Sequence, residues 1–295
     1  MRDDNDHTIR LHDGRALGYT EYGAPDGSVV IYAHGGLACR LDVSTASPIA
    51  AQTSIRLIAV DRPGIGLSDP NPGRTVANWA DDVTQLCEQL GIGDFAAMGW
   101  SMGGQYALAL GWALRSSVTR VAVLCGGLPL AGTDLFGQMP AVDRAFIRMS
   151  QRAPAIARAC IGSMGFVARC APGLYGRLAA RDLPPADAAV LRAEGFNTFG
   201  QMSAAALRHP EGHVEDYLAA MQPWGFEPEN VQVPVDVWGG ADDKFLDPGW
   251  PAELAGRIPG ATLRVRSGGH FMAHLHWQEI LAPLRPSLPD GTSTA

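Results

Sequence analysis

Charged residues are scarce in this chain, and lysine is almost absent. Charged side chains make up 18% of its 295 residues, and Lys244 is the one lysine among 23 basic residues. Thirty acidic residues leave a formal net charge of −7. Because a protein that binds phosphate backbones presents a basic face, this balance argues against nucleic acid as a partner.

Cysteine is also rare. The five cysteines form an odd number, and no two of them stand in a CxxC spacing. The sequence therefore predicts neither a complete disulfide framework nor a zinc site, and we expect no metal and no cofactor. Most of these residues are expected to be small buried apolar side chains. They are Cys39, Cys87, Cys125, Cys160 and Cys170.

A long membrane-spanning segment is missing as well. The first ten residues, MRDDNDHTIR, are acidic and lack the apolar stretch of a secretory signal, so we expect a cytoplasmic location. The stretch from Phe95 to Leu114 has no charge and is long enough to span a membrane. Four glycines, a serine and a glutamine interrupt it, and favour a buried strand, turn and helix. No membrane partner is expected.

Short apolar runs alternate with helical patterns along most of the chain. The clearest helical pattern covers Thr75 to Leu90. This alternation predicts an α/β fold with a mainly parallel sheet and helices on both faces. Ahead of it, Thr8–Leu11 and Ala16–Tyr22 predict an antiparallel hairpin at the sheet edge. The runs expected to be buried strands are Val29–Ala33, Ile55–Val60, Phe95–Gly99, Val118–Leu124, Val235–Trp238 and Thr262–Val265.

Residues 131–228 break this rhythm, because they offer helical segments without strands. We interpret residues 1–130 and 229–295 as one core domain, interrupted by a helical cap over 131–228. The cap holds nine arginines and nine acidic residues, and this balance predicts no preference for a positively or a negatively charged substrate. Its Met149 and Phe166 are candidate substrate contacts, and packing between cap helices is the alternative for such side chains.

The most specific motif is the pentapeptide Gly99-Trp100-Ser101-Met102-Gly103, a G-x-S-x-G sequence between an apolar strand and a helix. A sharp turn of this kind needs glycines beside it and leaves the serine hydroxyl exposed above the sheet. The helix N-terminus behind it favours developing negative charge. Ser101 is therefore the predicted nucleophile. The alternative is a glycine-rich connection with a capping serine.

A serine hydroxyl needs an adjacent base. Five histidines follow Ser101 in the chain, and His270 stands in SGGHF, directly after the last predicted strand. A side chain there projects over the end of the sheet, so His270 is the predicted base. The loop GGADDK after Trp238 offers two acids to orient it. We expect Asp242 to do so, and Asp243 is the alternative or a solvated partner of Lys244.

Donors for an oxyanion are expected beside the serine turn. His34-Gly35-Gly36-Leu37 follows the first core strand and supplies flexible backbone. The predicted donors are the backbone N–H groups of Gly36 and Met102. Leu37 and Trp100, which are next to the oxyanion loop and the nucleophile in the chain, are further candidate substrate contacts. His34 is expected to brace its loop.

These motifs resemble the capped branch of the α/β-hydrolase superfamily, which includes epoxide hydrolases, haloalkane dehalogenases, proline iminopeptidases and small esterases. The resemblance covers almost the whole chain. It implies neither epoxide nor carbon–halogen cleavage, since those enzymes carry an aspartate where Ser101 stands. A peptidase is also disfavoured, because HGGLACR lacks the proline usual in proline iminopeptidases. The matching segments are HGGL, DRPGIGLSD, GWSMGG, WGGADD and GGHF.

The leading hypothesis is hydrolysis of a small, largely apolar carboxylic ester, lactone or thioester. Ser101 would form an acyl-enzyme, which water activated by His270 would then cleave. The alternatives are other reactions of the same triad, namely carbon–carbon hydrolysis, acyl transfer, perhydrolysis or lysis. A slow-turnover receptor for a small molecule is a further alternative, because the superfamily includes hormone receptors that keep the triad. The sequence does not predict the oligomeric state.

Overall fold

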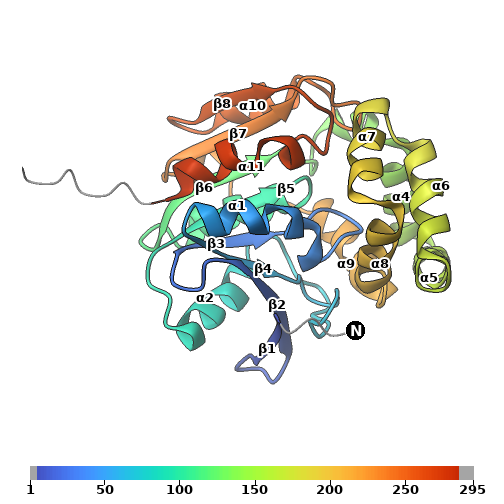
Figure 1. Ribbon diagram of the computed structural model, residues 1–295, viewed down its shortest axis with the longest axis horizontal. Coiled ribbons are helices and arrows are strands. Elements are labelled where there is room, and N and C mark those ends of the chain that lie inside the picture. The colour runs from blue at the N-terminus through green and yellow to red at the C-terminus, as the bar shows by residue number, and fades with distance from the viewer. Residues whose placement is uncertain (1–4, 286–295) are drawn as a thin grey trace, which may run out of the picture.

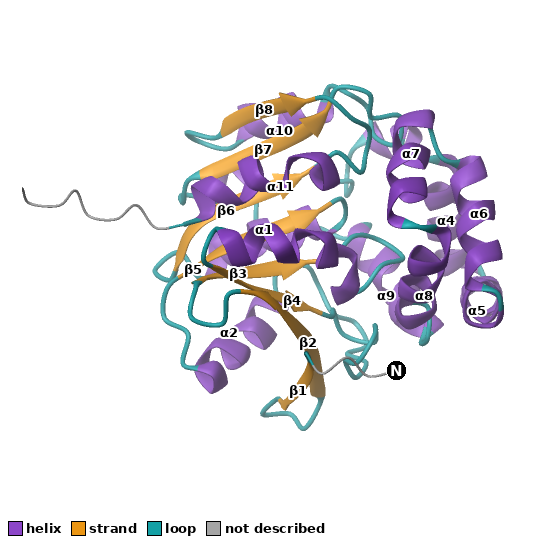
Figure 2. Cartoon of the chain, viewed as in Figure 1, coloured by secondary structure: helices purple, strands orange, loops and turns teal. Residues whose placement is uncertain are grey.

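Eight strands form one mostly parallel sheet in the computed structural model, which describes residues 5–285 (Figures 1 and 2). The strand order is β1-β2-β4-β3-β5-β6-β7-β8, and only the pairs β1–β2 and β2–β4 are antiparallel. The predicted α/β architecture with an antiparallel hairpin at one edge is confirmed. The strands are β1 (Asp6–Arg10), β2 (Ala16–Gly23), β3 (Ser28–Ala33), β4 (Ile55–Val60), β5 (Phe95–Trp100), β6 (Val118–Leu124), β7 (Val235–Gly240) and β8 (Thr262–Arg266).

Helices cover both faces of this sheet. Side chains alternate between the faces along each strand, so Ile31 packs toward one apolar core and Tyr32 toward the other. The first core includes residues of α2 (Trp79–Leu90), α3 (Gly103–Ala113) and α10 (Trp250–Arg257). The second includes residues of α1 (Ser47–Gln52) and α11 (Ala273–Leu281). Short 3₁₀ turns are η1 (Arg40–Ala46), η2 (Asp134–Gln138), η3 (Pro228–Asn230) and η4 (Ala282–Leu284).

The edge strand β8 and helix α2 differ from the predictions. Strand β8 is not buried, because it forms the edge of the sheet, and its Leu263 and Val265 are 42% and 50% exposed. An apolar run alone does not distinguish an edge strand from a central one. Helix α2 begins at Trp79, four residues later than the pattern suggested. The preceding residues form a turn in which the side chains of Thr75 and Asn78 accept hydrogen bonds from each other's backbone N–H groups.

Six helices occupy the stretch between β6 and β7, and residues 131–228, all of them described, contain no strand. We refer to these six as the cap helices. Figures 1 and 2 show them grouped beyond the carboxyl ends of the parallel strands. Four of them begin with proline, whose fixed φ suits the first helical position. They are α4 (Ala141–Arg152), α5 (Pro154–Cys170), α6 (Pro172–Asp182), α7 (Pro185–Glu194), α8 (Phe196–Ala206) and α9 (Pro210–Ala220).

A buried ion cluster joins the cap helices to the core. Asp216 of α9 accepts hydrogen bonds from Arg62, at 2.7 Å, and from Arg74, and the three side chains are at most 2% exposed. Burial alone would raise the pKa of Asp216, but the two guanidinium groups outweigh it and hold that pKa well below its usual range. Arg62 also donates to the carbonyls of His34 and Gly35. The cluster therefore ties α9 to the loop after β3.

Replacing Asp216 by alanine should strongly destabilise the fold, because it leaves two guanidinium groups buried without their carboxylate. We expect the free energy of unfolding in urea to fall by about 3–5 kcal/mol. Asp182→Ala, which removes an exposed carboxylate of α6, is the matched control and should change it by no more than about 0.5 kcal/mol. Equal stability of the two variants would contradict the role given to the cluster.

Candidate active site

Ser101 stands at the predicted sharp turn between β5 and α3. Its φ is 54°, in the left-handed region that few residues other than glycine adopt. The flanking glycines are needed for close packing. A Cβ on Gly99 would lie 2.2 Å from the carbonyl oxygen of Gly103, and a Cβ on Gly103 would lie 2.1 Å from that of Ala33. The backbone is thus strained at the residue whose hydroxyl it presents, as is common at functional sites.

Ser101, His270 and Asp243 form a continuous line of hydrogen bonds. His270 Nε2 lies 2.9 Å from Ser101 Oγ, and His270 Nδ1 lies 2.9 Å from Asp243 Oδ2. The side chains of His270 and Asp243 are each only 7% exposed. In this arrangement Nδ1–H donates to the carboxylate and Nε2 is free to accept the serine proton. The order nucleophile, base and acid is that of an activated serine.

The carboxylate that contacts His270 belongs to Asp243, so the prediction of Asp242 was wrong. Strand β7 continues to Gly240, two residues beyond its predicted end, and this displaces the loop. The N–H of Asp242 donates to the carbonyl of Gly268, at 2.9 Å, and its side chain is exposed. Asp243 is buried instead. Burial opposes its ionisation, but hydrogen bonds from His270 and two backbone amides hold the pKa of Asp243 below its usual value.

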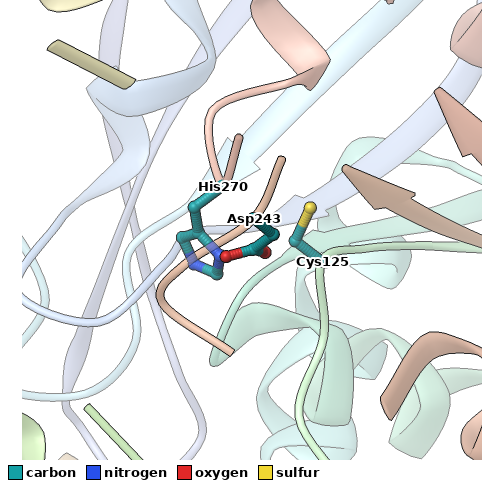
Figure 3. A group of neighbouring side chains, drawn as sticks. All are labelled: Cys125, Asp243 and His270. Atoms are coloured by element: carbon teal, nitrogen blue, oxygen red, sulfur yellow. The ribbon is translucent and has the colours of Figure 1, made fainter. Parts of the chain in front are cut away.

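Cys125 is a neighbour of this line that the sequence analysis missed (Figure 3). Ligand-type atoms of Cys125, Asp243 and His270 lie within 4.8 Å of one another. Both ring nitrogens of His270 are already hydrogen-bonded, and burial raises the pKa of the Cys125 thiol well above its usual value. The cluster therefore fits a metal ion poorly. Its position directly after β6, at the carboxyl edge of the sheet, was the available signal.

The expected oxyanion loop lies beside Ser101. Gly36 and Met102 both line the same cavity, and a Cβ on Gly36 would lie 3.4 Å from Met102 Cε. His34 is buried, and its ring contacts the carbonyl of Gly35, at 2.9 Å, and the N–H of Arg62, at 3.2 Å. Burial lowers the pKa of His34 well below its usual value, so the ring is neutral. These contacts give His34 the bracing position expected for it.

A cavity of about 280 Å³ lies above Ser101, between the core and the cap helices. The predicted contacts Leu37 and Trp100 line it, but Met149 and Phe166 do not. Phe166 lies on the outer side of α5, 58% exposed, and Met149 packs in the apolar cluster between cap helices. A methionine or phenylalanine in an amphipathic helix does not reveal which neighbour it faces. Cap residues that do line the cavity include Met139, Tyr175, Leu191, Phe199 and Met202.

Three carboxylates are among the polar side chains that line this cavity. Asp42, Asp143 and Glu194 line it, and no arginine or lysine is among the described residues that do so. Burial raises the pKa of Asp42 to about 7, and it also raises the pKa of Asp143, which accepts a hydrogen bond from Tyr217 at 2.8 Å. Glu194 pairs with His274. The cavity therefore offers no side-chain cation that is permanently charged to an anionic substrate.

A family model described as the alpha/beta hydrolase fold matches residues 28–276. The chain belongs to this family. One curated relative is the 30 kDa subunit of magnesium chelatase from Rhodobacter capsulatus, which is 27% identical over 85% of this chain and 83% of its own length. The non-heme chloroperoxidase of Streptomyces lividans is 33% identical, but that match spans only 33% of this chain and 36% of the relative.

Solved structures share the α/β-hydrolase fold. A thermophilic esterase from Thermogutta terrifontis superposes with a TM-score of 0.67 and 22% identity, covering 91% of this chain and 92% of the esterase. An N-acyl homoserine lactone degrading enzyme, Est816, gives a TM-score of 0.61 at 25% identity, covering 94% of this chain and 99% of that one.

Within residues 5–285, no helix is long and apolar enough to cross a membrane.

The two neighbouring aspartates provide a direct test of the site. Asp243→Asn should lower kcat on a chromogenic acetate ester by about 10⁴-fold, because the amide neither holds the Nδ1–H tautomer nor stabilises the imidazolium. Asp242→Asn is the matched control and should retain kcat within about twofold, since its side chain is exposed. A larger loss in Asp242→Asn than in Asp243→Asn would transfer the orienting role back to Asp242.

Proposed function

We propose that this α/β hydrolase is a serine hydrolase that cleaves a small, largely apolar carboxylic ester, lactone or thioester through an acyl-enzyme on Ser101. The observation that carries the proposal is the hydrogen-bonded line from Ser101 through His270 to Asp243, at 2.9 Å for each step. The line ends at a cavity with an apolar wall. A nucleophile, a base and an orienting acid in hydrogen-bonding reach are what acyl transfer requires.

The reaction follows from these positions. His270 Nε2 takes the proton of Ser101 as Oγ attacks the carbonyl carbon, and the N–H groups of Gly36 and Met102 stabilise the oxyanion. His270 then gives that proton to the leaving oxygen or sulfur, and the carbon–heteroatom bond breaks. Water, deprotonated by His270, attacks the acyl-enzyme, and Ser101 recovers a proton as the acid product leaves. Asp243 stabilises the imidazolium in both halves.

Electrostatics narrow the substrate class. Because carboxylates line the cavity and no described arginine or lysine does, a substrate with a carboxylate or phosphate would enter without a lysine or arginine counter-charge. Met139, Phe199 and Met202 instead present apolar surface. We infer that the acyl and alcohol portions are uncharged near the reacting carbonyl. If the leaving group of an ester or thioester is long and negatively charged, its charged part would have to lie outside the cavity.

A second candidate rests on one curated relative. The Rhodobacter capsulatus relative bears the name of a magnesium-chelatase subunit, so a role in such an assembly with slow or no turnover is the alternative. The intact hydrogen bonds of Ser101 and His270 favour catalysis over pure binding. Ester turnover that depends on Ser101 would support the first candidate. Turnover no faster than that of a serine-to-alanine variant would support the second.

Ser101→Ala and His270→Ala should each remove nearly all ester hydrolysis, since the two residues act as one catalytic unit. We expect kcat on a chromogenic butyrate ester to fall by about 10⁴-fold or more in each, and the double variant to be little worse. Melting temperatures should show that both variants are folded. Wild-type rates in both folded single variants would contradict the assignment.

The cap helices should select the acyl group without taking part in the chemistry. Phe199 lines the cavity and stacks on Tyr175 at a centroid distance of 6.2 Å. Phe199→Ala should therefore enlarge the cavity and shift the preference of the enzyme toward esters with longer acyl chains. Acetate ester hydrolysis should persist. Phe166→Ala, at an exposed position outside the cavity, is the matched control and should leave the chain-length profile unchanged. Identical profiles for both variants would rule out this role for Phe199.

A further inference from the structure

One carboxylate of the cap helices contacts the loop that carries His270. Asp187 lies in the first turn of α7 and is fully buried. Its Oδ1 accepts a hydrogen bond from the backbone N–H of Phe271, at 2.8 Å. Figure 1 shows α7 at the side of the cap nearest to the ends of β7 and β8. A side chain from residue 187 therefore holds backbone next to the predicted general base, which lies 83 positions later in the sequence.

The loop is shaped to admit this carboxylate. A Cβ on Gly269 would lie 2.4 Å from Asp187 Oδ1 and 2.6 Å from Oδ2, so any larger residue at 269 would displace Asp187. The preceding Gly268 has φ of +115°, which few other residues adopt. The two glycines thus let the turn present its amides to Asp187. This approach explains glycine at position 269 independently of the chemistry of His270.

The remaining anchors of the loop come from the core. The carbonyl of Gly268 accepts a hydrogen bond from the N–H of Asp242, and the carbonyl of His270 accepts one from Trp100 Nε1, both at 2.9 Å. These bonds fix the carbonyl side of the turn. Asp187 fixes its amide side. The backbone on both sides of the His270 side chain is therefore held, by the core in one direction and by α7 in the other.

The surroundings of the Asp187 carboxyl group affect its ionisation. Burial raises the pKa of Asp187, and the amides of Phe271 and His270 oppose that shift by favouring the carboxylate. The other groups facing it include His270, which favours its charge, and Asp243, which disfavours it. A hydrogen bond from a backbone amide to a carboxylate is stronger than one to a neutral oxygen. The N–H of Phe271 therefore makes its stronger contact with the ionised form of Asp187.

We propose that Asp187 is a positioning residue for His270: it fixes the Phe271 amide and so holds the imidazole in line with Ser101 and Asp243. This inference rests on the proposed serine hydrolase function for its effect on turnover. It assigns α7 a role beyond shaping the cavity. The catalytic geometry of the core then depends on the docking of a cap helix, and displacement of α7 would loosen the base.

Kinetics of Asp187 variants test the proposal. Asp187→Ala should lower kcat on an acetate ester by about 10- to 100-fold with KM changed by less than about threefold, because a displaced base affects the reaction more than binding. Asp187→Asn keeps one acceptor for the Phe271 amide but turns an amino group toward the turn, so its loss should be smaller, about 3- to 10-fold. Asp182→Ala, on the exposed end of α6, is the matched control and should match wild type.

A second readout does not depend on turnover. The His270 Nδ1 proton shared with Asp243 should give a downfield proton NMR signal, assigned by its loss in His270→Ala. The signal should broaden or move in Asp187→Ala and Asp187→Asn and stay unchanged in Asp182→Ala. If Asp187→Ala does not fold, Asp187→Asn alone carries both measurements.

The outcomes separate the two proposals. An unchanged signal together with wild-type kcat in every folded Asp187 variant would overturn the positioning role. If wild type and Ser101→Ala hydrolyse esters equally, the proposed function fails. The NMR signal then still decides whether Asp187 holds His270.

Discussion

Three loops must meet at one edge of the sheet for the hydrogen bonds of Ser101, His270 and Asp243 to form. The loops leave the carboxyl ends of β5, β7 and β8, and in a parallel sheet these ends lie together. The sheet therefore brings together residues that are more than 140 positions apart in the chain. Each loop is then fixed locally, by the strained backbone at Ser101, by the amides around Asp243 and by the two glycines before His270. The rest of the site depends on this convergence.

Buried carboxylates connect the cap helices to that edge at two separate points. Asp216 reaches the loop after β3 through Arg62, and Asp187 reaches the loop after β8 through the amide of Phe271. Buried charge is costly unless it is paired and hydrogen-bonded. Asp216 is paired with two buried guanidinium groups, and Asp187 accepts the backbone N–H of Phe271. The two contacts therefore attach the cap helices to the core at separate points.

Much of this arrangement was predictable from sequence because its signals are local. The apolar runs of β4 and β6 gave both ends of each strand, and the G-x-S-x-G turn located Ser101. The aspartate that contacts His270 was missed by one residue, since the end of β7 depends on pairing with β8, which a single strand does not reveal. Met149 and Phe166 were misplaced for a similar reason. Helical periodicity defines an apolar face, but tertiary packing decides whether that face meets a cavity, another helix or solvent.

The central claim is that Ser101 carries the acyl group during turnover. The most direct measurement is mass spectrometry of the protein, quenched in acid during hydrolysis of a chromogenic butyrate ester. The proposal predicts a population heavier by one butyryl group, with the modification on the peptide that contains Ser101 and no such population in Ser101→Ala. A butyryl group on another residue, or turnover by Ser101→Ala at the wild-type rate, would contradict it.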